Sequence, residues 1–198
     1  MADTNDVIKF YSELADDFFL DILVLKQVDP INFSAPFLHA HCLELSGKTA
    51  ALKLNVNYSK KGHEIMELYN ILSATIPEIS SLLPTAQDFL DYKQLWIKEA
   101  DVSKGVEFPE ENFSKLELAY FIENIKDLKY GFNKKHEAIS ALHVFSKSFN
   151  TDFGKLYNTC RKQYSSKELD TRLIEKLKKA FNSATNIENE LKKLIDLS

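Results

Sequence analysis

The sequence has few of the residues that interrupt helices, and few cysteines. Its 198 residues include five Gly, five Pro and two Cys. This scarcity excludes collagen-like and linker-like chains, and the 44% of hydrophobic residues excludes a strongly disordered one. Cys42 and Cys160 lie far apart, without the spacing of a metal or redox motif. Such cysteines are typical of a reducing compartment, so we expect a folded cytoplasmic protein with two buried thiols.

Long hydrophobic runs are also absent. The longest apolar stretch, 18–25, is interrupted by Asp21 and is too short to cross a bilayer. The first ten residues, MADTNDVIKF, lack the basic start and apolar stretch of a secretory signal. The sequence therefore predicts no membrane insertion.

Arginine is scarce, and the charge is unevenly distributed. The chain has 23 Lys and two Arg, and the net charge is −10 over residues 1–128, +7 over 129–179 and −1 over 180–198. One hypothesis is that the basic segment binds RNA or a nucleotide, because clustered cations release counterions when they meet polyanions. The other is that these residues cover solvated helix faces and are neutralised by the acidic part. The candidate anion-binding residues are Lys134, Lys135, Arg161, Lys162, Arg172 and Lys179.

Apolar residues recur every three or four positions along most of the chain, which is the period of an amphipathic helix. We predict helices over 6–27, 37–54, 63–74, 85–96, 114–129 and 133–149, a hinge over 150–154 and a short helical segment over 155–164. The predicted fold is all-α, a compact up-and-down bundle of five to seven helices with a long C-terminal helix. We expect one domain over residues 1–198.

Two local features refine this prediction. The helix over 37–54 has a face of small residues that lets a neighbouring backbone approach closely: Ala40, Gly47, Ala50 and Ala51. Further on, Pro77 and Pro84 confine any helix between them to one or two turns, and Thr85 can cap the helix that follows.

The C-terminal helix is expected over 166–195. Ser165 and Glu168 have the spacing of a capping box, and apolar residues then follow at steps of three and four for about seven turns. A helix of this length exceeds what a compact domain of this size needs. The part that extends beyond the bundle is a candidate surface for a second copy of the chain or a protein partner, with Ile187, Leu191 and Leu194 as the candidate interface residues. The alternative is that this helix packs on its own bundle.

Residues 37–72 read FLHAHCLELSGKTAALKLNVNYSKKGHEIMELYNIL. This segment resembles the HEPN superfamily of prokaryotic helical domains. The matching positions are His41, Glu44, Leu45, Lys48, Gly62, His63, Ile65 and Leu68. Because Glu44 and Lys48 are four residues apart, they can form an ion pair along one helix. The resemblance implies a helical domain and a component of a bacterial defence or toxin-antitoxin system.

HEPN proteins that cleave RNA carry an Arg followed after four to six residues by a His. The two arginines of this chain, Arg161 and Arg172, have no His downstream. The pair of residues most similar to this Arg–His motif is Lys129 with His136, but the Lys ammonium group lacks the planar, two-donor geometry of the Arg guanidinium. We therefore favour a non-catalytic binding or interaction protein. A divergent ribonuclease that uses Lys129 and His136, and an RNA or nucleotide binder, are the alternatives.

Metal and cofactor motifs are not recognisable. His39 and His41 are two residues apart and point away from each other on a helix, while His136 and His143 are separated by two turns. The sequence has no phosphate-binding glycine loop and no zinc-protease motif. We predict neither a metal nor a cofactor.

Overall fold

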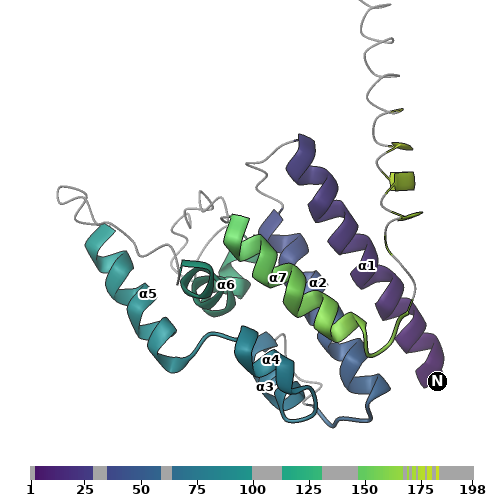
Figure 1. Ribbon diagram of the computed structural model, residues 1–198, viewed down its shortest axis with the longest axis horizontal. Helices are drawn as coiled ribbons and strands as arrows, with labels where there is room; N and C mark the ends of the chain where they lie inside the picture. Colours follow the sequence, from purple (N-terminus) through teal and green to yellow (C-terminus); the bar gives the residue numbers. More distant parts are fainter. Residues whose placement is uncertain are drawn as a thin grey trace, which may run out of the picture.

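All the regular secondary structure in the described part of the chain is helical (Figure 1). The computed structural model describes residues 3–28, 35–58, 64–99, 113–130 and 147–166, and nine more residues between 169 and 182. The helices found there are α1 (Thr4–Val28), α2 (Ala35–Lys53), α3 (Ile65–Ser73), α4 (Pro77–Leu82), α5 (Ala86–Glu99), α6 (Phe113–Tyr130) and α7 (Lys147–Arg161). The all-α prediction is therefore confirmed, with seven helices among these residues.

Helix α2 lies at the centre of the arrangement. It packs against α1, with which it forms an antiparallel pair, and against α3, α6 and α7 (Figure 1). Helices α1, α2 and α7 run across the view, whereas α6 is seen nearly along its axis. The helices are thus not all aligned in the way that an up-and-down bundle requires. Helix α5 lies at the edge of the molecule and packs on α6.

Several helix ends follow from local chemistry. The hydroxyl of Thr85 accepts a hydrogen bond from the Asp88 amide at 3.2 Å, and the Asp88 carboxylate accepts one from the Thr85 amide at 2.6 Å. This reciprocal pair confirms the predicted cap of α5. Just after the end of α2, Asn55 has φ 54°, a left-handed conformation that Asn tolerates. The Val56 amide then bonds back to the Ala51 carbonyl at 2.8 Å and closes the helix end.

The small face of α2 is buried, as predicted. Ala40, Ala50 and Ala51 are fully buried in the core. A Cβ atom added at Gly47 would come within 2.8 Å of Leu68 Cδ2 on α3. Since that spacing is shorter than van der Waals contact, the absence of a side chain at Gly47 is what lets α3 pack closely on α2.

The predicted hinge over 150–154 is wrong, because α7 is continuous from Lys147 to Arg161. Phe149, Phe153 and Tyr157 recur every four residues and are all buried, so a single apolar stripe extends through the expected break. Gly154 is accommodated inside the helix near Phe19, 4.0 Å from where its Cβ would be. Tertiary packing here outweighs the low helix propensity of Gly.

Most of the predicted helix over 166–195 lies outside the described residues, including the candidate interface residues Ile187, Leu191 and Leu194. The residues described between 171 and 182 have helical backbone conformation. Among all described helices, none is both long enough and apolar enough to cross a membrane.

Candidate functional site

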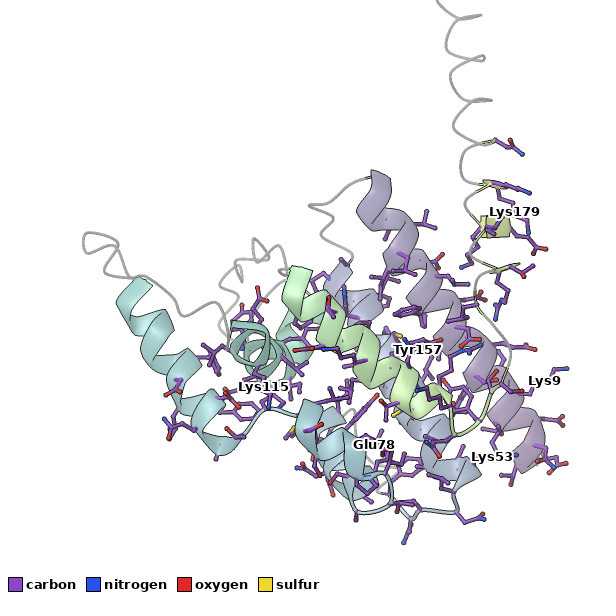
Figure 2. All side chains as sticks on the ribbon, viewed as in Figure 1. Lys9, Lys53, Glu78, Lys115, Tyr157 and Lys179 are labelled. Carbon is purple, nitrogen blue, oxygen red and sulfur yellow. The ribbon has the colours of Figure 1, made fainter. Side chains whose placement is uncertain are left out.

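A buried carboxylate joins α1 to α7. Asp16, in the middle of α1, is 5% exposed. The Tyr157 hydroxyl donates a hydrogen bond to Asp16 Oδ1 at 2.5 Å. Arg161 donates from Nε to Oδ1 at 3.0 Å and from Nη2 to Oδ2 at 3.1 Å. Tyr157 (labelled in Figure 2) and Arg161 lie one turn apart on α7. This helix therefore presents two donors to one carboxylate of α1.

The segment that follows α7 adds two more cations. Arg172 donates from Nη1 to Asp16 Oδ2 at 3.2 Å and from Nη2 to Asp17 Oδ1 at 2.7 Å. Lys176 Nζ donates to Asp21 Oδ1 at 2.7 Å. Three carboxylates of α1 thus meet three cations from α7 and the segment after it, and their formal charges cancel. We name these side chains the ionic cluster: Asp16, Asp17, Asp21, Arg161, Arg172 and Lys176.

Burial and hydrogen bonding fix the protonation states in this region. Burial, and then the hydrogen bond to Asp16, raise the pKa of Tyr157, so its hydroxyl keeps the proton that it donates. Burial by itself lowers the pKa of Arg161, but the hydrogen bonds and charge of Asp16 outweigh this effect and raise it. Tyr157 is therefore a neutral hydrogen-bond donor and Arg161 a charged one at physiological pH.

The thiol of Cys42 and the phenol of Tyr164 lie near Asp16, and the second thiol, Cys160, lies near Cys42. Burial raises the pKa of Cys160 to about 12, and it raises the pKa of Cys42 well above the ordinary value. Both are free, buried thiols, as the sequence predicts. Burial, followed by the charge of Asp16, also raises the pKa of Tyr164. Its buried hydroxyl has no hydrogen-bond partner in the described part of the chain.

A basic pocket lies on the outer face of α7. Its volume is about 410 Å³, and the described residues that line it are Lys155, Asn158, Thr159, Arg161 and Lys162. Lys155, Thr159 and Lys162 are four and then three residues apart, which places them on one face of the helix. Lys155 forms an exposed ion pair with Asp152 at 2.8 Å. Arg161 is shared between this pocket and the ionic cluster.

The two described histidines have structural environments. The ring of His39 is buried against Phe153, with ring centroids 4.5 Å apart, and its Nδ1 lies 2.6 Å from the Ala35 carbonyl oxygen. The His41 ring packs between Phe18 and Phe37, with centroids 5.6 and 4.3 Å away. The two rings contact different elements.

The Glu44–Lys48 ion pair predicted from the spacing of four residues is present. Lys48 Nζ lies 2.6 Å from Glu44 Oε1, and the carboxylate is buried. Ile65 and Leu68 of α3 are in the core, where they pack around α2. Gly62 and His63 lie outside the described residues. The matched positions that can be located thus have structural roles.

The other predicted site residues are dispersed. Of the candidate anion-binding residues, the structure brings Arg161 and Lys162 together in the basic pocket, places Arg172 on the aspartates of α1 and leaves Lys179 exposed (Figure 2). The side chain of Lys129 and the residues Lys134, Lys135 and His136 lie outside the described part. Lys155, Asn158 and Thr159 were not predicted, although their spacing with Lys162 on one helix is readable in the sequence.

The described residues contain no group of three or more His, Cys, Asp or Glu side chains arranged to hold a metal ion. Comparisons of the chain with known protein families, with curated proteins and with solved structures found no match.

Proposed function

We propose that this chain is a non-catalytic, HEPN-like helical protein whose function is to bind a partner or ligand. The observation that carries the proposal is the pairing of both arginines of the sequence with α1 aspartates. An arginine that stabilises phosphoryl charge in a nuclease has to turn its guanidinium toward the substrate. Here Asp16 occupies the Nε and Nη2 donors of Arg161, and Asp16 and Asp17 occupy Nη1 and Nη2 of Arg172. Neither guanidinium can therefore present a two-donor fork to a reacting phosphoryl group, and Arg161 keeps only Nη1 for a single contact.

Exposed aromatic side chains on the α1–α2 pair support the binding part of the proposal. Phe10 is 61% exposed and Phe37 is 40% exposed. The Phe37 ring packs edge-on against His41, which holds it in place on the surface. Aromatic residues are enriched at protein interfaces because they bury a large area at small entropic cost.

The test of the non-catalytic part is RNA cleavage by the purified chain. We expect labelled single-stranded and structured RNAs to remain intact over hours. The His136→Ala and Lys129→Ala variants are the controls for contamination. Cleavage that disappears in both variants would contradict the proposal and establish the divergent ribonuclease. Cleavage unchanged in both would be assigned to a contaminant.

Self-association is tested by light scattering over a range of concentrations. Leu191→Asp with Leu194→Asp disrupts the predicted C-terminal surface, and Phe10→Ser with Phe37→Ser disrupts the exposed aromatics. We expect a dimer that one pair of substitutions converts to a monomer. A monomeric mass for the unaltered chain at every concentration would show that homodimerisation is wrong and leave a different protein as the partner.

On the basis of the HEPN resemblance, we also propose that the protein is a component of a bacterial defence or toxin-antitoxin system. Phage challenge of cells with and without the chain tests this part. Equal survival against a broad phage panel, with no effect of the chain on growth, would contradict it.

A further inference from the structure

The basic pocket on α7 has the size of a small-ligand site and a polar, cationic lining. Its volume of about 410 Å³ falls within the range of about 300–1,000 Å³ typical of such sites. Three of its five described lining residues are cations, and the other two, Asn158 and Thr159, offer an amide and a hydroxyl as hydrogen-bond donors. Such a lining matches a ligand group that carries negative charge and several acceptor oxygens.

Arg161 gives the pocket a fixed cation. Its side chain is nearly buried, and two of its nitrogens are held by both oxygens of Asp16. The third nitrogen, Nη1, has no hydrogen-bond partner among the described residues. A guanidinium held in this way loses little conformational freedom when an anion binds to its remaining donor. Lys155 and Lys162 also line the pocket and are exposed, and Lys155 can exchange its ion pair with Asp152 for a contact to the ligand.

The surroundings of the pocket favour a small anion over a long polyanion. The ionic cluster beside it is neutral overall, and its Asp17 and Asp21 side chains are 43% and 46% exposed. The chain as a whole carries a net charge of −4. A nucleic acid strand extending along the ionic cluster would meet these carboxylates, whereas a ligand confined to the pocket would meet only Asp152, the ion-pair partner of Lys155.

We infer that the basic pocket binds the phosphate group of a small phosphate ester, with Arg161 as its fixed anchor and Lys155 and Lys162 as adjustable contacts. This inference rests on the proposed function of binding without catalysis and names the class of ligand. Phosphate suits the site because its oxygens accept several charge-assisted hydrogen bonds at once.

The experiment is isothermal titration of the full chain at about 50 mM salt, where electrostatic binding is strong. Inorganic pyrophosphate presents phosphate alone, adenosine monophosphate presents phosphate with a nucleoside, and adenosine presents the nucleoside alone. We expect single-site binding of the first two and no binding of adenosine. Lys162→Glu should weaken both affinities by at least about tenfold, the size of one lost charge-assisted hydrogen bond.

Lys179→Glu is the matched control. It makes the same change in charge at an exposed lysine on the segment after α7 (Figure 2), and it should leave both affinities unchanged. Lys162 is also exposed, so neither substitution disturbs the core, and circular dichroism checks the fold of each variant. Arg161 is not substituted, because its removal would leave the buried Asp16 carboxylate without its ion-pair partner and would destabilise the fold.

Three results would overturn the inference: no binding of pyrophosphate or the nucleotide at millimolar concentration, equal weakening by Lys162→Glu and Lys179→Glu, or much tighter binding of a 12-nucleotide RNA that depends on Lys179. The last result would establish the extended basic surface instead. Release of phosphate from the bound nucleotide would contradict the non-catalytic proposal while leaving the pocket intact. Absence of binding would remove the pocket and leave the non-catalytic proposal standing.

Discussion

The contact between α2 and α3 and the contact between α1 and α7 are held by different forces. At the first, Gly47 lets Leu68 and Tyr69 approach the α2 backbone, and the Tyr69 hydroxyl donates to the Leu43 carbonyl at 3.0 Å. No formal charge takes part in these contacts. At the second, the buried Asp16 is ion-paired with Arg161.

The two contacts allow the contribution of close packing to stability to be distinguished from that of a buried ion pair. A close-packed contact responds to added volume and hardly at all to salt. A buried ion pair responds to the loss of either partner, because the remaining charge is left without solvent or counterion. The two contacts should therefore fail under different substitutions, which the following predictions exploit in order of expected size.

Asp16→Asn should have the largest effect. It leaves Arg161 buried beside a neutral amide, and removing one partner of a buried pair costs about 3–5 kcal/mol. Chemical denaturation measures the change in unfolding free energy. Asp17→Asn, at an aspartate that is 43% exposed, is the control and should cost less than about 1 kcal/mol. Similar costs for the two substitutions would mean that burial of Asp16 does not govern its contribution.

Gly47→Leu should destabilise the α2–α3 contact by about 1–3 kcal/mol, because Leu68 and Tyr69 have to move to admit the side chain. Gly154→Ala is the paired control in α7, where an added Cβ meets nothing closer than 4.0 Å. It should stabilise the protein by about 0.5–1 kcal/mol, since Ala has less backbone freedom to lose than Gly. The unfolding temperatures of both variants, compared with that of the unaltered protein, test these two expectations. A higher unfolding temperature for Gly47→Leu would contradict close packing at this position.

Alkaline pH should weaken the fold through its buried thiols. The pKa of Cys160 rises from 9.0 to about 12 in the native state, so the unfolded state releases this proton first. Stability from this group is complete below pH 9 and is lost as the pH rises from 9 toward 12, by about 1.4 kcal/mol per pH unit. In Cys160→Ala the fall of unfolding free energy above pH 9 should be shallower by that amount. If the slope of unfolding free energy against pH is the same in Cys160→Ala, the pKa of the Cys160 thiol is not raised in the native state.

Lys176→Ala should have the smallest effect. The ion pair of Lys176 with Asp21 is partly exposed, and such pairs contribute about 0–1 kcal/mol. The difference from the unaltered protein should vanish in 1 M salt, where the screening length is about 3 Å. A cost above 2 kcal/mol that persists in salt would mean that the lysine acts through packing and not through charge.

Local contacts could be predicted from the sequence, and distant ones could not. The Glu44–Lys48 pair, the Thr85 cap and the small face of α2 each depend on residues within one or two turns, so spacing was sufficient. The expected hinge over 150–154 failed because it rested on local propensity, whereas buried contacts of Phe149 and Phe153 keep α7 continuous.

The candidate site shows the same limit. Arg161 and Lys162 were found as neighbours in a basic segment, but nothing in their spacing distinguishes a solvated arginine from one buried against an aspartate 145 positions away. The sequence did not predict the pocket residues Lys155, Asn158 and Thr159. A pocket forms on the face of a helix that the neighbouring helices do not cover, and the sequence of that helix does not show which face this is.

Taken alone, the amino-acid order determined that this chain is helical and where most described helices begin and end, because helical periodicity and capping are properties of neighbouring residues. Tertiary structure decided which charges are buried and paired, and which cations remain at a pocket. The physical reason is that an ion pair or a cavity wall depends on distances between segments remote along the chain, and those distances are set by packing around α2.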